Sequence, residues 1–593
     1  MEVTRTFDLL DRYNALFPDK EDALAGKVKG QWKKYSSREY IENANLISYG
    51  LMALGLKSGD RIATISNNRP EWNFMDMGMA QLGIVQVPLF TTLDAAGYQR
   101  IMEHAEVKLA VVSDQSLFNK IKGFAGEISL LEKIYTFDEV DGAPHWKEIR
   151  DLGSQNKEKY TNELLAIKKE IKPTDCVSLI YTSGTTGNSK GVLLSHQNLV
   201  SNGKAVAGVF QLQPGHRYLS ILPICHVGER MAIYQTQYSG CSLYYGENLG
   251  TIATDLQDIK PQGFGAVPRI LEKVYDKIVL KGQKLTGIKK KLFFWALNLG
   301  LKYKAHGENG LWYECQLFLA RKIIFSKWQA ALGGNIISIG VGGAALQPRL
   351  ERVFWAAGIK LLNMYGLTET SPVITINRAT APNLMLGTVG SVIEGVELKL
   401  ADDGEILCKG PNVMLGYYKD EQATAEAIDP EGWFHTGDIG KLEDGKFLKI
   451  TDRKKEIFKL SNGKYVSPLA VENIFKESLY IDQLMVIGDG EKFAGALISP
   501  SMDNLKIWCR ENNVTASSSD ELIKEEAVKK FYGDIVKRIN QKIDKDEQVR
   551  RFRLVSTEWS PDSGELSPTL KLKRRVINEK YKGLIEEIYG TNQ

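Results

Sequence analysis

Apolar residues follow two different spacings along the chain, and each spacing predicts a different element. From Ser36 to Leu54 they recur every three or four residues, which is typical of one buried face of a helix. Ser36 and Glu39 have the spacing of a capping box at the start of this helix. Gly55 is predicted to end the helix, and the β-rich run 61–66 (RIATIS) predicts a strand after it.

The same alternation of strand and helix recurs further along the chain. The runs 177–182 (VSLIYT) and 336–343 (IISIGVGG) predict strands, and Ser195 is placed to cap a helix after the first of them. Strands that alternate with helices are typical of α/β layers with largely parallel sheets. Because 593 residues are too many for one hydrophobic core, several packed units are expected.

The pattern changes near Asp452. After the segment 451–468 come a helix, the short strands LMVIGD and AGALISP, and the charged helical stretch 519–545. This succession predicts a smaller α+β unit. We therefore predict an α/β N-terminal domain over residues 1–452 and an α+β C-terminal domain over residues 453–593.

Composition and charge favour a globular protein without a nucleic-acid partner. The chain is 43% hydrophobic and 25% charged, and its net charge of +4 is far milder than in most nucleic-acid-binding domains. The six cysteines are scattered, which favours reduced thiols in a cytoplasmic protein. The N-terminal residues lack the apolar stretch of a signal peptide. The most apolar run, 292–301, has about half the length that spans a bilayer, so the chain is expected to be cytoplasmic and at most to rest on a membrane surface.

The segment 181–196 (YTSGTTGNSKGVLLSH) carries the strongest chemical signal, between a predicted strand and a predicted capped helix. Gly184 and Gly187 free the backbone to wrap around an oxygen-rich ligand, and Lys190 adds a positive charge. Hydroxyl donors are supplied by Thr182, Ser183, Thr185 and Thr186. This chemistry predicts that the segment binds a polyphosphate.

Two alternatives for this segment are weaker. A Walker P-loop requires Gly-Lys-Ser/Thr at its end, whereas Lys190 is preceded by Ser189 and followed by Gly191. A flexible Ser/Thr/Gly linker seldom joins a strand to a capped helix. Polyphosphate binding therefore remains the preferred interpretation.

With this segment, further motifs in the same order resemble the adenylate-forming superfamily of acyl-CoA synthetases, luciferases and peptide-synthetase adenylation domains. They are YGLTET (365–370), GEILCKGPNVMLGYY (404–418), WFHTGDIG (433–440), DRKKEIFKLSNGKYVSP (452–468) and PTLKLKRR (568–575). The resemblance spans nearly the whole chain. It implies a multi-layer N-terminal domain with mainly parallel sheets and a small mobile C-terminal domain that swings about a hinge, for which we choose Lys455.

The resemblance also implies a role for individual residues in binding ATP and Mg²⁺. Tyr365 is expected to stack on adenine, Thr368 to contact the α-phosphate, and Glu369 to hold Mg²⁺ together with Thr182. Asp438 is expected to bind both ribose hydroxyls, with Arg453 near the ribose and Lys571 as the catalytic lysine. The implied nucleotide site further includes Gly343, Ala344, Ala345, Asn363 and Gly366.

The terminal motif leaves a choice between two lysines. Lys571 and Lys573 both lie in the basic run KLKRR, which alone is typical of a solvated charged face. Lys-Leu-x-Arg at 571–574 fits the family's ending and favours Lys571. The family's common glycine before the lysine is replaced here by Leu570, so the sequence departs from the pattern at this point.

Further motifs favour the long-chain fatty acyl-CoA branch, with a fatty acid and coenzyme A as substrates. LPICHVGERM (222–231) resembles a segment of that branch and places His226 beside the acyl and phosphate site; GFGAVPRILEKVY (263–275) and an insertion at about 281–334 also match. Arg230 stands where some members have an aromatic gate, so gating is not implied. Another carboxylic acid, transfer to acyl carrier protein, and a non-catalytic nucleotide-binding relative remain alternatives, and the sequence does not decide whether the protein is a homodimer.

The insertion combines basic and apolar residues. Lys289, Lys290 and Lys291 precede an apolar stretch that includes Phe293 and Leu297. Such a segment can lie on anionic lipid. Packing of its apolar face onto the body of the protein is the favoured alternative.

Overall fold

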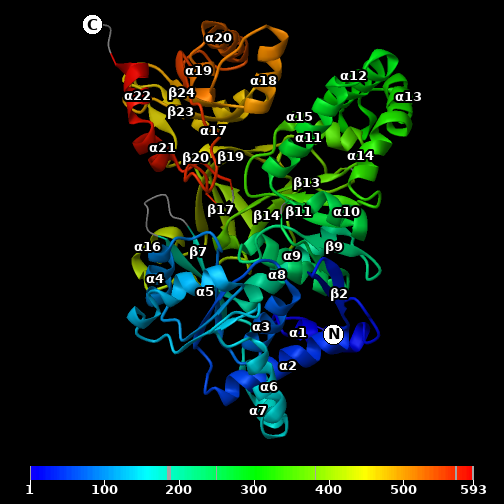
Figure 1. Cartoon of the computed structure of the whole chain (residues 1–593), viewed down its shortest axis with the longest axis vertical. Coiled ribbons are helices and arrows are strands. Elements are labelled where there is room, and N and C mark those ends of the chain that lie inside the picture. The colour runs from blue at the N-terminus through cyan, green and yellow to red at the C-terminus, as the bar shows by residue number, and fades with distance from the viewer. Residues whose placement is uncertain (1, 183–188, 249, 381, 568–569, 591–593) are drawn as a thin grey trace.

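The computed structural model describes residues 2–182, 189–248, 250–380, 382–567 and 570–590. Figure 1 shows a large N-terminal part and a smaller C-terminal part at one end of it. Within the described residues the N-terminal part contains two large sheets and one smaller sheet, with helices between and around them. The predicted α/β class is confirmed.

The first large sheet has a parallel centre. Its seven strands follow the order β18-β8-β7-β4-β3-β5-β6, and β7, β4, β3, β5 and β6 run parallel. Their bounds are β3 Arg61–Ile65, β4 Val85–Leu89, β5 Leu109–Val112, β6 Lys133–Thr136, β7 Cys176–Thr182, β8 Lys190–Ser195 and β18 Gly416–Tyr417. One face of this sheet has its own core, shared with α4 and α5.

The second large sheet is also parallel at its centre and antiparallel at both edges. Its nine strands follow the order β15-β14-β13-β12-β11-β9-β10-β1-β2. Their bounds are β1 Leu24–Val28, β2 Gln31–Tyr35, β9 Arg217–Ser220, β10 Ser242–Tyr245, β11 Gly263–Ala266, β12 Ser338–Val341, β13 Leu361–Gly366, β14 Val373–Ile376 and β15 Ser391–Val392. The largest hydrophobic core joins this sheet to β7, β8 and the helices beside them.

Helices of the N-terminal part fill the space between and around the sheets (Figure 1). Their bounds are α1 Asp8–Leu16, α2 Ser37–Ala53, α3 Pro70–Ala80, α4 Ala95–His104, α5 Gln115–Lys122, α6 Lys147–Gln155, α7 Lys157–Glu170, α8 His196–Phe210, α9 Val227–Tyr238, α10 Ile252–Ile259, α11 Pro268–Gln283, α12 Gly287–Leu301, α13 Leu311–Ala320, α14 Ser326–Ala331, α15 Pro348–Ala356 and α16 Glu421–Ala427. A short π-helix η3, Arg321–Phe325, joins α13 to α14, and the one-turn helix η4, Thr368–Thr370, follows β13. No helix of the described residues is both long and apolar enough to cross a membrane.

The four-stranded antiparallel sheet β16-β17-β19-β20 leads into the C-terminal part. Its strands are β16 Glu397–Leu400, β17 Glu405–Lys409, β19 Phe434–Glu443 and β20 Phe447–Arg453. Strand β20 runs across the predicted boundary between residues 452 and 453, and an exposed turn begins at Lys454. The boundary itself stays a prediction.

The C-terminal part has its own hydrophobic cores. Its strands are β21 Phe458–Lys459, β22 Tyr465–Val466, β23 Ile481–Ile487, β24 Gly495–Pro500 and β25 Arg551–Leu554. Its helices are α17 Pro468–Phe475, α18 Met502–Glu511, α19 Ser519–Leu522, α20 Glu526–Asn540, α21 Arg574–Lys580 and α22 Lys582–Tyr589. Its three-stranded sheet is mixed, with β23 antiparallel and β25 parallel to β24, so this part is α+β, as predicted.

Local sequence signals account for several elements. Helix α2 begins with a capping box in which Ser36 accepts from the backbone N–H of Glu39 and Glu39 accepts from that of Ser36. Ser195 caps α8 in the same way. The strand predicted at 336–343 is shorter, with Ser338–Val341 as β12.

One strand in this region was not predicted. The segment 181–196 follows β7 and precedes the capped helix α8, as expected, but Lys190–Ser195 within it form strand β8, antiparallel to β7. The apolar run VLL within it pairs with the equally apolar β7, which buries both strands. Strands β7 and β8 therefore form an antiparallel pair, and α8 follows β8.

Candidate active site

The parallel pairing of β12 and β13 brings two predicted motifs to one edge of the nine-stranded sheet. The loop with Gly343 follows β12, and Gly366 ends β13. Gly343 has a φ of +84°, which a side chain would strain. Ala344 and Ala345 beside it are exposed. A Cβ on Gly366 would lie 1.7 Å from the carbonyl oxygen of Pro372, so only glycine fits there.

Asn363 lies on β13 close to this edge. Its Nδ2 donates to the carbonyl oxygen of Thr388 at 2.9 Å. Its Oδ1 is buried and has no hydrogen-bond partner among the described residues. A buried acceptor without a partner is costly, and an amino group such as that of adenine would satisfy it.

Asp438 is the centre of a polar cluster on β19 and β20. Tyr365 donates from its hydroxyl to Oδ2 of Asp438 at 2.8 Å, and Nε of Arg453 lies 3.1 Å from Oδ1. Asp438 and Arg453 are also paired across the two strands. Burial raises the pKa of Asp438, against the opposing effect of Arg453. Each carboxylate oxygen keeps a further lone pair that could accept from a ribose hydroxyl.

Glu369 is held by a residue that sequence reasoning did not select. Tyr417, on β18, donates from its hydroxyl to Oε1 of Glu369 at 2.9 Å. Nζ of Lys190 lies 4.6 Å from the centre of the Tyr417 ring. The GYY run at 416–418 was recognised only as part of a family motif, and its contact with Glu369 depends on the pairing of β18 with β8.

The predicted phosphate-binding segment can be placed only at its two ends. Thr182 and Lys190 face each other as the last pair of β7 and β8, and both are half-buried. The predicted ligand residues Ser183, Gly184, Thr185, Thr186 and Gly187 lie outside the described residues. Thr368 is half-buried at the start of η4, which carries Glu369. Tyr417 links strand β8 to η4, because its ring lies beside Lys190 and its hydroxyl donates to Glu369.

Lys571 lies where the C-terminal part meets these residues. It is exposed to solvent, yet the charges of Arg453, Asp438 and Glu369 all act on its ammonium group. Desolvation by the surrounding protein, with the nearby Arg453 charge, lowers the pKa of Lys571 to about 8. Lys573 instead occupies the N-cap position of α21, where its side chain forms no capping hydrogen bond. The arrangement favours Lys571 as the lysine directed toward the site.

Arg574 anchors the segment that carries Lys571, and the sequence analysis gave it no role of its own. Its Nε lies 3.0 Å from Oε2 of Glu456, and its Nη1 lies 2.9 Å from Oε1 of Glu472. Burial opposes the charge of Arg574, but the two carboxylates outweigh burial and raise its pKa. Leu570, where the family has glycine, has a φ of +62°. The position at which the family has glycine therefore has left-handed backbone geometry in this chain.

His226 precedes α9 and caps it. Its Nδ1 accepts from the backbone N–H of Gly228 at 3.0 Å, which leaves the proton of the neutral ring on Nε2. Desolvation, together with the charge of Lys571, lowers the pKa of His226 to about 4. A neutral imidazole with a free Nε2–H suits hydrogen-bond donation to a ligand.

Arg230, at the position of the aromatic gate, has a structural role instead. It is fully buried, and its Nη2 lies 2.6 Å from Oδ1 of Asp76. Tyr234 donates to the other oxygen of Asp76 at 2.7 Å. This buried ion pair ties α9 to α3.

Polar contacts join the two parts of the chain. Arg269 on α11 forms an ion pair with Asp482 on β23 and lies 3.3 Å from Glu272. Arg349 donates to the carbonyl oxygen of Lys476 at 3.3 Å. In this arrangement the C-terminal part delivers Lys571 to the edge where Glu369 and Asp438 lie.

The described residues contain no group of three or more His, Cys, Asp or Glu side chains placed to hold a metal ion. Mg²⁺ usually binds through one or two carboxylates together with substrate phosphates and water. Glu369 and the Thr182 hydroxyl fit that mode of binding.

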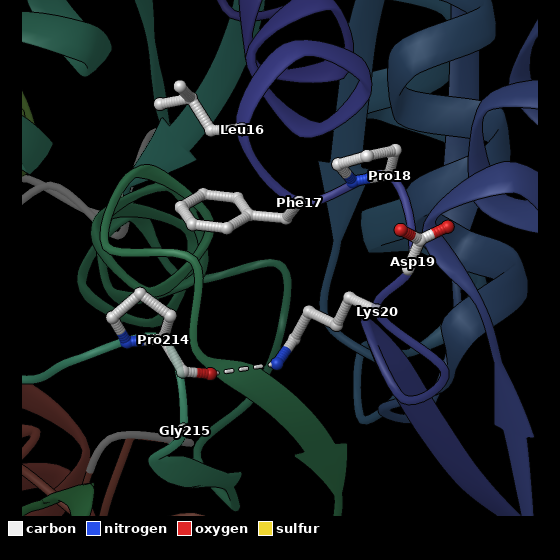
Figure 2. A pocket seen from close by; sticks show the side chains of 7 residues that line it. All are labelled: Leu16, Phe17, Pro18, Asp19, Lys20, Pro214 and Gly215. Atoms are coloured by element: carbon white, nitrogen blue, oxygen red, sulfur yellow. Dashed lines mark hydrogen bonds between the residues drawn. The ribbon is translucent and has the colours of Figure 1, made fainter.

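A separate hollow lies near the N-terminus (Figure 2). Seven residues line it: Leu16, Phe17, Pro18, Asp19, Lys20, Pro214 and Gly215. Lys20 donates to the carbonyl oxygen of Pro214 at 2.9 Å, so its charge is already engaged. None of the predicted site residues lines this hollow.

The fold and this constellation define a class of protein, and the chain belongs to the AMP-binding enzyme family. The family profile matches residues 10–418, and the profile of the AMP-binding enzyme C-terminal domain matches residues 455–593.

Individual relatives resemble the chain over most of its length. It is 32% identical over 569 residues to the long-chain-fatty-acid–CoA ligase FadD15 of Mycobacterium bovis, covering 95% of this chain and 93% of the relative. It is 30% identical to the long-chain-fatty-acid–CoA ligase ACSBG2 of Xenopus laevis, covering 96% of this chain and 81% of that protein. The crystal structure of the anthranilate CoA ligase AuaEII with anthranoyl-AMP aligns with a TM-score of 0.73 at 18% identity, covering 98% and 99% of the two chains, and shows a common fold.

Proposed function

We propose that the protein is an ATP-dependent long-chain fatty acid–CoA ligase that forms an acyl-AMP and transfers the acyl group to coenzyme A. The observation that carries the proposal is the position of Lys571, from the C-terminal part, among Glu369, Asp438 and Arg453. Relatives named long-chain-fatty-acid–CoA ligases, similar over nearly the full chain, support the choice of substrates. A cytoplasmic location, where both ATP and coenzyme A are available, is part of the proposal.

The first step joins the two substrates. A carboxylate oxygen of the fatty acid attacks the α-phosphorus of ATP, the bond to the β-phosphate oxygen breaks, and pyrophosphate leaves. Negative charge grows on the phosphoryl oxygens, and the Lys571 ammonium and the Thr368 hydroxyl are placed to stabilise it. Mg²⁺, held through Glu369 and Thr182, would supply charge neutralisation on the phosphates.

The remaining residues orient the nucleotide. Asp438 would accept from both ribose hydroxyls, Tyr365 would stack on adenine, and Asn363 would accept from the adenine amine. Gly343, Ala344, Ala345 and Gly366 would let the backbone approach the base closely. Arg453 would hold the ribose side, since it already lies against Asp438.

The second step requires Lys571 to leave. The coenzyme A thiol attacks the acyl carbon, AMP departs, and a thioester forms. We propose that the C-terminal part turns about the exposed turn at Lys455 and brings the loop around Gly463 toward the site. Such alternation lets one site serve both steps.

A panel of acids from acetate to oleate, with coenzyme A as acceptor and pyrophosphate release as the readout, tests the proposal. We expect the highest kcat/KM with long-chain acids. Acyl carrier protein in place of coenzyme A tests the alternative acceptor. A higher kcat/KM with short-chain than with long-chain acids would favour a different acid, and no pyrophosphate release with any acid of the panel would favour a nucleotide-binding protein without ligase activity.

A further inference from the structure

The insertion exposes a large apolar face. Trp312 and Phe318 on α13 are 77% and 61% exposed, and Leu311, Leu319 and Ile323 are exposed as well. These residues recur along one side of the helical run formed by α13 and η3. We refer to these five side chains as the apolar face of α13. Clusters of this kind, unlike single exposed apolar residues, mark interaction sites.

The opposite side of the same run holds it firmly on the protein. Tyr313 and Leu317 are buried, and the Tyr313 hydroxyl donates to the carbonyl oxygen of Leu299 at 2.7 Å. Arg321 donates to the carbonyl oxygen of Ala356 on the neighbouring α15 at 2.8 Å. Because this side is anchored, the helix cannot turn its apolar face into the core of the same chain.

The apolar side chains of the neighbouring helix α12 are buried, unlike those of the apolar face of α13. Phe293 and Leu297 on α12, the residues that sequence reasoning connected with lipid, are buried, and Gly300 approaches Val353 on α15. The favoured packing of that apolar stretch onto the body is therefore what the structure shows. In Figure 1, α12 and α13 lie at an outer edge of the molecule, beside the C-terminal part.

The insertion carries a strong excess of positive charge. Residues 281–330 contain ten lysines and arginines against two glutamates, whereas the whole chain has 76 against 72 acidic residues. Lys289, Lys290 and Lys291 are exposed on α12, Lys322 is exposed on the run that carries the apolar face, and Lys327 is exposed on the following α14. Nζ of Lys322 lies 4.8 Å from the centre of the Phe318 ring, so positive charge borders the apolar face directly.

We propose that the apolar face of α13 docks on an anionic lipid surface, with the exposed lysines of the insertion facing the lipid headgroups. Apolar side chains beside lysines are the composition of segments that lie in the membrane interface. A second copy of this chain would bring two strongly basic insertions together, and like charges disfavour that pairing. Lipid phosphates supply the complementary charge.

Sedimentation of the full-length protein with vesicles tests the proposal. Vesicles of phosphatidylcholine and phosphatidylglycerol should bind the protein, and vesicles of phosphatidylcholine alone should bind it much less. Trp312→Glu with Phe318→Glu should weaken binding at least tenfold. The matched control is Leu130→Glu with Leu165→Glu, which changes two exposed leucines outside the insertion, at 42% and 51% exposure, and should bind as the parent does.

The lysines have their own control. Lys289→Gln, Lys290→Gln and Lys291→Gln should weaken binding by about fivefold each at low salt, because a lysine near an anionic surface contributes about that factor. The effect should shrink as salt screens the charges. Neutralising the exposed Lys157, Lys159 and Lys169 of α7 to Gln should leave binding unchanged.

Either of two results would overturn the proposal. One is equal binding by the parent and the Trp312/Phe318 variant, with both melting at the same temperature. The other is a parent protein that ignores anionic vesicles and dimerises in analytical ultracentrifugation, with the dimer abolished by Trp312→Glu and Phe318→Glu; the apolar face of α13 would then belong to a second copy. Both readouts are independent of ligase activity.

Discussion

The hydroxyl of Tyr365 donates a 2.8 Å hydrogen bond to Oδ2 of Asp438, across 73 residues of sequence. The bond joins the end of β13 to β19, and so links the predicted adenine residue to the predicted ribose residue. Arg453 holds the other oxygen of the same carboxylate. The orientation of Asp438 is therefore set before any nucleotide arrives.

Asp438→Ala should raise the KM for ATP by about 10²- to 10⁴-fold, the loss of two such bonds. The carboxylate would accept charge-assisted bonds from the ribose, each worth roughly 1.5–3 kcal/mol. Tyr365→Phe keeps the carboxylate and removes only its donor, so we expect a rise of about fivefold, on the order of 1 kcal/mol. Steady-state kinetics at saturating acid and coenzyme A measure both. A KM within about twofold of the parent for Asp438→Ala, or ~0.4 kcal/mol, would assign the ribose to another residue.

Lys571→Ala should slow the first step and spare the second. Losing one preorganised donor costs about 10²–10³ in rate, measured as pyrophosphate release. Supplied with synthetic fatty acyl-AMP, the same variant should form the thioester at nearly the parent rate. Equal damage to both steps would mean that the lysine is structural.

Two further variants complete the separation of the steps. Lys573→Ala is the matched control. If this variant, rather than Lys571→Ala, slowed only the first step, Lys573 would be the catalytic lysine. Lys455→Pro should spare the first step and slow the second, because a fixed φ at the turn prevents rotation of the C-terminal part.

The pH dependence of kcat/KM should show a falling limb near pH 8. Desolvation by the surrounding protein, with the nearby Arg453 charge, lowers the pKa of Lys571 to about 8, so the free enzyme carries this charge below pH 8 and loses it above. Initial rates of pyrophosphate release should then fall about tenfold per pH unit on the alkaline side. Lys571→Arg should be slower but flat over this range, since guanidinium does not titrate there. An unchanged alkaline limb in Lys571→Arg would assign the titration to another group.

Glu369→Gln should lose activity that excess Mg²⁺ partly restores, because a neutral amide binds a hard cation poorly. Tyr417→Phe is its control: it removes the 2.9 Å bond to Glu369 and keeps the carboxylate. We expect the Mg²⁺ concentration for half-maximal rate to rise strongly in the first variant and little in the second. Identical Mg²⁺ titrations for Glu369→Gln and the parent would remove Glu369 from the metal site.

Leu570→Gly should be more stable than Leu570→Ala, the reverse of the usual order. Both truncations lose the same side-chain packing, but only alanine retains a Cβ at a φ of +62°. Left-handed geometry costs a residue with Cβ roughly 1–2 kcal/mol. Denaturant titration of the two variants compares their free energies of unfolding. A more stable alanine variant would contradict the left-handed geometry at this position.

Sequence alone determined the elements whose signals are local. The capping boxes of α2 and α8 bring together residues three apart in sequence, so the pattern is sufficient to place them. Apolar periodicity likewise predicted β3 and β7 and the α/β class. The ordered motifs gave the family, because the nucleotide chemistry requires particular residue types.

Only the tertiary structure decided which distant residues meet. Tyr417 reaches Glu369 across 48 residues, and Arg230 reaches Asp76 across 154. The strand pairing of β18 with β8 and the packing of α9 on α3 create these contacts. No local pattern encodes them, because periodicity identifies a face of an element but not what that face meets.

The insertion shows the same limit. The sequence analysis singled out one apolar stretch with basic residues nearby, at Phe293 and Leu297, and weighed lipid contact against the favoured burial, but it did not identify the apolar face of α13. The structure buries Phe293 on α12 and exposes Trp312 on α13, since only one of the two apolar faces lies against α15 and the rest of the body. The sequence therefore determined the family, the motifs and the local elements, and the tertiary structure decided which side chains share a site and which apolar face is left to solvent.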